Sequence, residues 1–284
     1  MKRYLNLGCG TRFHPDWINI DVVSSDPRVI RHDLTLGIPL ADASCAVVYH
    51  AAVLEHFRPE DALLFLRDCH RVLVPGGTIR VGVPDLEQLC RLYLNRLEAA
   101  QAGDTQAAYD YDWIMLEMFD QMVRERSGGA MLNWLRQDPL PNPSFIDERV
   151  GEEGRELLRI LQGQKADEAR TQSRRAAFWD RLSHMPRQWR RLGAAIKRAL
   201  LVRVLGKEQF NALEVGQFRL GGEVHQWMYD RYSLSRLLVK ADFTNPILQD
   251  PATSQIPDWN RFGLDRLPDR RVIKPDLMFM EATK

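Results

Sequence analysis

Glycines and carboxylates stand where short apolar runs end in the first third of the chain. Gly8 and Gly10 follow the run Tyr4–Leu7, and Asp21 closes the next run. Glycine permits backbone conformations and close approaches that a Cβ would block, and a carboxylate at the end of a strand can accept both hydroxyls of a ribose. Asp33 follows a third run, where it is placed to reach an adenine amino group. This order of residue types predicts a site for a nucleoside-bearing ligand.

Each feature has a plainer interpretation when it stands alone. A GxG turn after a strand also occurs in dinucleotide folds and in ordinary turns, and Asp21 or Asp33 singly fits a turn or a helix N-cap. The longer GxGxxG pattern of NAD-binding folds is missing after this strand, which counts against NAD. The ordered set of one turn and two acids favours a nucleoside site of another kind.

Short strands are expected to position these side chains. Five apolar runs bounded by turn residues predict them, at Tyr4–Leu7, Trp17–Ile20, Val29–Arg31, Ala46–Tyr49 and Thr78–Val83. A helical period over Pro59–Leu73, followed by the helix stop Pro75-Gly76-Gly77, completes an α/β pattern. The fold class is therefore predicted to be α/β, with a doubly wound, mostly parallel, Rossmann-like sheet. The segment 11–16 is too short for the usual first helix, so this crossover is expected to be a loop or a single turn.

The rest of the chain divides by pattern into a helical part and a second α/β part. Residues 91–220 are dominated by helix formers and predict a large helical insertion that serves as a substrate lid. Residues 221–284 predict a helix at Tyr232–Lys240 and strands at Asn245–Gln249 and Leu277–Glu281. They would complete the core of residues 1–90 with an antiparallel last strand.

Four motifs, LNLGCGT, HPDWINID, VVYHAAVLEH and LRDCHRVLVPGGTIRVGVPD, resemble class I S-adenosylmethionine (SAM)-dependent methyltransferases of the type 11 group. The resemblance is greatest to members from polysaccharide biosynthesis, and it covers residues 4–90 and the C-terminal part. It implies SAM as the cofactor, S-adenosylhomocysteine as the product, and no metal. The insertion carries no such resemblance.

The resemblance also implies which residues contact SAM. They are Gly8, Cys9 and Gly10 around the methionine portion, Asp21 at the ribose, Val22 on the adenine, Asp33 and Leu34 at the adenine edge, and His50 and Ala51 at the methyl-donor end. Two positions depart from the pattern, because Asn6 stands where an acid is usual and Arg12 where many relatives have a third glycine. These departures leave the orientation of the methionine end open.

Transfer of a methyl group to a hydroxyl is an in-line displacement that can require a base to accept the proton. His225, oriented by Asp230, is the first predicted base, and Asp85 and His56 follow it. Each has a structural alternative. His225 can pack its segment on the core, Asp85 can cap a helix, and His56 can secure the loop after the fourth strand.

A basic stretch lies inside the insertion. Residues 170–207 hold eleven arginines and lysines against one acid, Asp180. Within it, residues 185–203 have apolar side chains at helical spacing, which predicts a basic amphipathic helix. Such a helix can contact an anionic membrane peripherally, or it can be a lid helix whose apolar face packs on the core. RNA binding is disfavoured, because no nucleic-acid module is recognisable.

The composition is that of an ordinary globular protein, with 284 residues and a formal net charge of +1. We find no export signal, no run long enough to span a bilayer, and no cysteine spacing typical of a metal site. A cytoplasmic enzyme, with contact to the inner membrane face as an option, is therefore expected. The predicted activity is O-methylation of a sugar or glycan intermediate, including a lipid-linked one. The alternatives are a small-molecule natural-product methyltransferase and a SAM-binding module without catalysis.

Overall fold

Seven strands form one sheet in the computed structural model, which describes residues 3–24, 26–173 and 201–284. The strands are β1 (Tyr4–Leu7), β2 (Ile18–Asp21), β3 (Val29–Arg31), β4 (Cys45–Ala51), β5 (Leu73–Pro84), β6 (Thr244–Gln249) and β7 (Leu277–Thr283). They lie in the order β3-β2-β1-β4-β5-β7-β6. The first five pair in parallel, and β7 runs antiparallel to both β5 and β6. The predicted mostly parallel, doubly wound sheet with an antiparallel last strand is confirmed.

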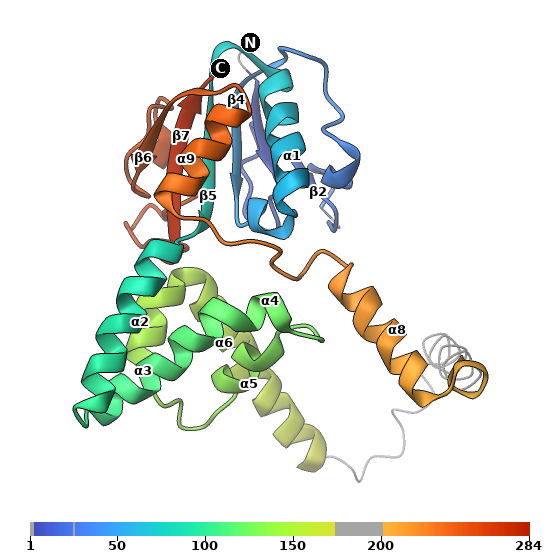
Figure 1. Cartoon of the computed structure of the whole chain (residues 1–284), viewed down its shortest axis with the longest axis vertical. Helices are drawn as coiled ribbons and strands as arrows, with labels where there is room; N and C mark the ends of the chain where they lie inside the picture. Colours follow the sequence, from blue (N-terminus) through green and yellow to red (C-terminus); the bar gives the residue numbers. More distant parts are fainter. Residues whose placement is uncertain (1–2, 25, 174–200) are drawn as a thin grey trace.

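One face of the sheet is covered by two amphipathic helices, α1 (Pro59–Val72) and α9 (Arg231–Lys240) (Figure 1). Leu66 and Cys69 of α1 and Leu234 and Leu238 of α9 are fully buried in one core with the strand residues that face them. The helical periods in the sequence predicted both elements to within a residue at each end. Burial of these apolar stripes fixes the helices on the sheet.

The other face is covered by the β6–β7 connection, residues 250–276. Trp259 and Phe262, in the short helix η5 (Trp259–Phe262), pack with Trp17 and Tyr49 of the sheet side in a second core. As expected, no helix is described between β1 and β2. A segment far along the sequence therefore covers the face that a first crossover helix would otherwise shield from water.

A buried arginine holds this connection in place. Arg80 of β5 is fully buried, and its guanidinium pairs with Asp265 at 2.7 Å and with Glu281 at 2.8 Å. It also donates to the backbone carbonyls of Thr253 and Asp250. These charges lie out of water, but each has a charged partner and further hydrogen bonds, which is the condition for burying them without a large cost.

The predicted helix stop at Pro75-Gly76-Gly77 is wrong in detail. Helix α1 ends at Val72 and β5 begins at once with Leu73, so the proline and glycines lie inside the strand. Gly76 has φ +75° and donates to the carbonyl of Lys284, and the pairing of β5 with β4 shifts register in this region. Glycine here forms an irregularity in a strand rather than the end of a helix.

Helices make up the lobe between β5 and β6. They are α2 (Leu86–Gln101), α3 (Thr105–Met115), the π-helix η3 (Leu116–Asp120), α4 (Gln121–Val123), α5 (Gly129–Leu135), α6 (Pro143–Ser173) and α8 (Lys207–Arg219). Trp113, Ile114 and Ile146 are fully buried in a core of their own. Figure 1 shows the lobe below the sheet, at the end where β5 runs into α2. Lobe residues can therefore reach the carboxyl ends of the parallel strands.

Most of the basic stretch lies outside the described residues, since placement is given for 170–173 and 201–207 but not for 174–200. The predicted amphipathic helix and its contact with a membrane through 185–203 stay predictions. Within the described ranges, no helix has the length and apolar character needed to cross a bilayer.

Candidate functional site

The glycine turn after β1 forms one wall of the site. Gly8 and Gly10 have φ of +62° and +52°, which side chains disfavour. The amides of Gly8 and Cys9 both donate to the carbonyl of Ile20 in β2, at 2.8 and 3.2 Å. A Cβ on Gly8 would lie 2.4 Å from a methyl of Val53, whereas one on Gly10 would meet no described atom within 4 Å. Gly8 thus serves close packing, and Gly10 borders open space.

Asp21 joins the end of β2 to this turn. Its Oδ2 accepts from the amide of Gly10 at 2.8 Å, and its Oδ1 accepts from the amide of Val23 at 2.8 Å. The side chain is half-buried, and a carboxylate has lone pairs for further donors. The structure therefore brings together the turn and the acid that the sequence placed at successive strand ends.

Asp33 follows β3 and caps the short helix η1 (Leu34–Leu36). Its Oδ1 accepts from the amide and the hydroxyl of Thr35, at 2.9 and 2.7 Å. The hydrogen bond from the Thr35 hydroxyl, with that from the amide, lowers the pKa of Asp33 and keeps it ionised. Leu34 is half-buried against the main core, and Val22 is 54% exposed beside the end of β2. Asp33 is thus the N-cap of η1. Its Oδ2 makes no hydrogen bond to the described residues.

His50 does not line the site, contrary to the sequence-based prediction. It is fully buried and its ring packs on Phe65 of α1 at a centroid distance of 5.2 Å. Burial lowers the pKa of His50 to about 3, so the ring is neutral. Side chains alternate along a strand, and His50 points to the α1 face while Ala51 points to the other. Ala52, which follows, has φ +56°, a strained conformation for a non-glycine residue at the end of β4.

A cavity of about 110 Å³ lies at this carboxyl edge. Its walls include the glycine turn with Cys9, the strand end at Ala51 and Ala52, and charged residues from elsewhere. Burial, with the charge of Asp21 as a smaller contribution, raises the pKa of the Cys9 thiol to about 12, so Cys9 is a neutral wall residue.

Lobe residues complete this cavity, and sequence reasoning missed them. Lys274 pairs with Glu153 of α6 at 3.0 Å, and Arg12 pairs with Glu156 at 3.2 Å. Helix α6 reaches the site because it kinks at Gly151, where a Cβ would lie 2.5 Å from Pro275. A glycine inside a helical period is a sequence signal for such a kink. No local signal predicts that the kinked helix meets the segment that contains Lys274 and Pro275.

A second and much larger cavity, of about 990 Å³, lies between η1, α1 and the chain after α8. Its walls are of mixed character, with Leu36, Leu64 and Leu220 beside Arg58 and Asp61. His56 and Gln226 also border it, at the end nearest the carboxyl edge of the sheet. The cavity has room for an acceptor larger than a single small ring.

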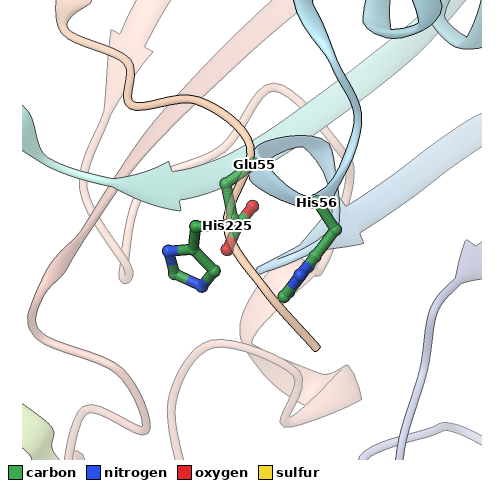
Figure 2. A group of neighbouring side chains, drawn as sticks. All are labelled: Glu55, His56 and His225. Atoms are coloured by element: carbon green, nitrogen blue, oxygen red, sulfur yellow. The ribbon is translucent and has the colours of Figure 1, made fainter. Parts of the chain in front are cut away.

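Three titratable side chains converge beside this larger cavity (Figure 2). Glu55 and His56, in η2 (Leu54–His56) after β4, meet His225 from the segment between α8 and α9. The two imidazole rings are 4.8 Å apart at their centroids, edge to face. Burial, then the neighbouring His56, lowers the pKa of His225 to about 3, and burial raises the pKa of Glu55 to about 8. Glu55 was missed as a site residue by the sequence analysis, which singled out only its neighbour His56.

Asp230 and Asp85 are helix caps, not part of this group. Asp230 begins α9 in a capping box, accepting from the amides of Tyr232 and Ser233 at 2.9 and 2.7 Å. Asp85 begins α2 and accepts from the amide of Gln88 at 3.0 Å. The predicted orienting contact from Asp230 to His225 is wrong, because the carboxylate is turned to the first turn of its own helix.

Known proteins share part of this chain. Residues 21–81 match the methyltransferase domain family. The match starts at Asp21 and ends within β5, so it spans the acid, η1, β4 and α1 but not the glycine turn. A probable S-adenosylmethionine-dependent methyltransferase of Mycolicibacterium smegmatis is 45% identical over 60 residues, which are 21% of this chain and 23% of that protein. The chain thus matches under a quarter of that relative's length.

Solved methyltransferase structures resemble the chain more distantly. A SAM-dependent methyltransferase from Archaeoglobus fulgidus aligns with 100% of this chain and 86% of its own, at 10% identity and a TM-score of 0.37. An S-adenosylmethionine-dependent methyltransferase from Mesorhizobium loti aligns with 99% and 90%, at 12% identity and a TM-score of 0.35. The strand order and the antiparallel β7, rather than these likenesses, define the fold.

Proposed function

We propose that this protein is a SAM-dependent methyltransferase of class I. The observation that carries the proposal is the link between Asp21 and Gly10, which joins the end of β2 to a glycine turn at the carboxyl edge of a parallel sheet. This is where nucleotide-type ligands of such sheets bind. The match of residues 21–81 to the methyltransferase domain family supports it.

The residues at this edge fit SAM in chemistry as well as in position. Asp21 offers acceptors for the ribose hydroxyls, and exposed Val22 offers an apolar surface for the adenine. The open space at Gly10 admits the methionine portion of SAM, which is attached to the ribose. We propose that Arg12 and Lys274 receive the methionine carboxylate. The exposed Arg12–Glu156 pair is of a kind that contributes little to stability, so Arg12 can exchange partners.

When bound, SAM would supply a methyl group to the acceptor oxygen, with S-adenosylhomocysteine as the leaving group. The protein must then align the acceptor and exclude water. We propose that the acceptor enters the cavity of about 990 Å³ and reaches the methyl donor beside His56. The ring of His225 contacts that of His56 and would hold His56 in position.

We further propose that the acceptor is a hydroxyl of a sugar or glycan intermediate. The cavity wall supports this class, because Arg58, Asp61 and Gln226 offer both donors and acceptors to hydroxyl groups. Its apolar part, with Leu36, Leu64 and Leu220, suits an attached lipid or other apolar group.

Two measurements test these proposals in turn. Calorimetry should detect SAM binding and a raised melting temperature with SAM, and absence of both would overturn the cofactor site. Transfer of labelled methyl groups should then be measured with nucleotide sugars, lipid-linked sugars and phenolic small molecules as acceptors. Transfer to the phenols and not to the sugars would overturn the acceptor class while leaving the cofactor site intact.

A further inference from the structure

Glu55, His56 and His225 form a cluster of titratable side chains from two distant segments of the chain. Glu55 and His56 end the loop after β4, and His225 arrives from a segment 169 positions further along the chain. One ligand atom from each side chain lies within 4.8 Å of those of the other two. Figure 2 shows the three side chains turned toward a common space.

Four polar atoms of this cluster have no hydrogen bond to the described residues. Both carboxylate oxygens of Glu55 and the Nδ1 atoms of His56 and His225 are buried without a hydrogen bond to any described residue. A buried carboxyl group without a hydrogen bond is costly, and buried polar groups in folded proteins are normally hydrogen-bonded, paired or bound to a metal. Buried atoms of this kind indicate a missing partner.

The backbone holds the cluster in place. The amides of Gln226 and Trp227 donate to the carbonyl of Glu55 at 2.7 and 3.2 Å, and the amide of His225 donates to the carbonyl of Gln121 at 3.0 Å. The two segments that supply the three side chains are therefore joined by their main chains. Preorganised ligands of this kind reduce the entropy lost when a ligand binds.

The neighbouring cations do not serve as the partner. Arg124 pairs with Asp120 at 2.9 Å and with Glu223 at 3.1 Å, and Lys274 pairs with Glu153 at 3.0 Å. Both cations have carboxylate partners of their own, and no ion pair joins either of them to Glu55 among the described residues.

We propose that Glu55, His56 and His225 bind one Zn²⁺ ion. Two imidazoles and one carboxylate form a ligand set that zinc uses, and three protein ligands leave a fourth position open. Imidazole ligands disfavour Mg²⁺ and Ca²⁺, which take oxygen. Zinc bonds of about 2.0–2.1 Å place tetrahedral ligands roughly 3.4 Å apart, so the side chains close slightly on the ion. His56 borders the larger cavity, so a fourth ligand could reach the ion from that side.

Zinc binding at this cluster does not depend on the proposed methyl transfer, but the role suggested for the zinc ion rests on that proposed function. A zinc ion at the cavity wall would polarise an acceptor hydroxyl and favour loss of its proton. Tyr229 has a buried hydroxyl without a partner among the described residues, and the charge of Glu55 contributes to raising the pKa of that phenol. It can donate to the second oxygen of Glu55, which would orient the carboxylate.

The test measures metal binding, not turnover. The full-length protein is purified without chelator and its metal content determined, then it is stripped with EDTA and titrated with Zn²⁺ by calorimetry and thermal unfolding. We expect one zinc ion per chain and a raised melting temperature. Co²⁺ replacing zinc should give the visible spectrum of a four- or five-coordinate nitrogen–oxygen site, without the intense near-ultraviolet band of thiolate ligands.

Variants locate the site. Glu55→Gln and His225→Gln should each weaken Zn²⁺ binding by on the order of 100-fold or more, since loss of an outer-shell partner alone costs 10–100-fold. His70→Gln, where the ring packs on Phe243 away from the cluster, and Cys90→Ser, at the exposed thiol, should bind as the unaltered chain does. Circular dichroism checks that each variant folds.

Three results would overturn the proposal. They are substoichiometric zinc with no thermal shift, undiminished binding in folded Glu55→Gln and His225→Gln, and a thiolate spectrum with Co²⁺. Retention of iron or manganese in place of zinc would overturn the identity of the ion. None of these outcomes bears on SAM binding, which is measured separately.

Discussion

Two buried polar clusters, one under the β6–β7 connection and one at the carboxyl edge of the sheet, differ in how far their polar atoms are hydrogen-bonded. On the side of the β6–β7 connection, Arg80 pairs with Asp265 and Glu281, and Asp265 also accepts from the hydroxyl of Tyr49 at 2.6 Å and from the indole of Trp259 at 3.0 Å. At the carboxyl edge, both carboxyl oxygens of Glu55 and the Nδ1 atoms of His56 and His225 have no hydrogen bond to the described residues.

The difference separates structure from function. A buried charge with a full set of partners stabilises one arrangement of the chain, because losing any partner leaves the others uncompensated. A buried carboxylate without partners destabilises the chain until something binds it. The first cluster therefore fastens residues 250–276 to the sheet, and the second is poised for a ligand.

The largest effect is expected at the satisfied cluster. Asp265→Asn leaves Arg80 with one carboxylate fewer in the interior, so the free energy of unfolding should fall by about 3–5 kcal/mol. Urea denaturation measures it. The control is Asp269→Asn in the same segment, whose pair with Arg271 is exposed to solvent and should contribute little to stability. An equal loss of unfolding free energy in the two variants would contradict the conclusion that Arg80 and its partners hold residues 250–276 on the sheet.

Asp21 lies between the two extremes, because backbone amides satisfy it while its surface stays accessible. Asp21→Ala should lower the affinity for SAM by about 1.5–3 kcal/mol, the scale of hydrogen bonds to a charged group. Calorimetry measures the change. Asp26→Ala, at the exposed pair with Arg28, is the matched control and should bind SAM normally. Unchanged affinity in Asp21→Ala would remove this residue from the cofactor site.

Asp230 tests whether a partnered carboxylate is structural even when it is close to a functional segment. Asp230→Ala should lower the free energy of unfolding by about 1 kcal/mol through loss of the N-cap of α9. Methyl transfer by the folded variant should match that of the unaltered chain. A loss of turnover without loss of stability would return Asp230 to the catalytic residues.

The smallest effect is expected where partners are missing. In EDTA-treated protein, Glu55→Gln should leave the free energy of unfolding within about 0.5 kcal/mol of its original value, or raise it. Burial raises the pKa of Glu55 to about 8, so the glutamate must take up a proton to be buried at neutral pH, whereas an amide is already neutral. The same carboxyl-to-amide change as in Asp265→Asn thus has a very different result. A loss of several kcal/mol would mean that Glu55 has a structural partner after all.

Local signals accounted for much of the fold. The runs at Tyr4–Leu7 and Val29–Arg31 match β1 and β3, and the helical periods match α1 and α9 nearly to their ends. Gly10 and Asp21 were also found, because strand ends in a parallel sheet share one edge. Alternation along β4 could have excluded His50, since Val48 and His50 share the face that carries the core, but its direction depends on which face α1 covers.

By itself, the sequence determined the order of the strands and helices, the glycine turn and the acid after β2, because these depend on neighbouring residues and on period. Only the tertiary structure decided that His225 meets Glu55, that the β6–β7 connection covers a sheet face, and that the kink at Gly151 brings Glu153 to Lys274. These contacts join residues more than a hundred positions apart, and no local pattern encodes which distant segment supplies the partner. Burial, and whether a buried group is satisfied, exist only once the chain has folded.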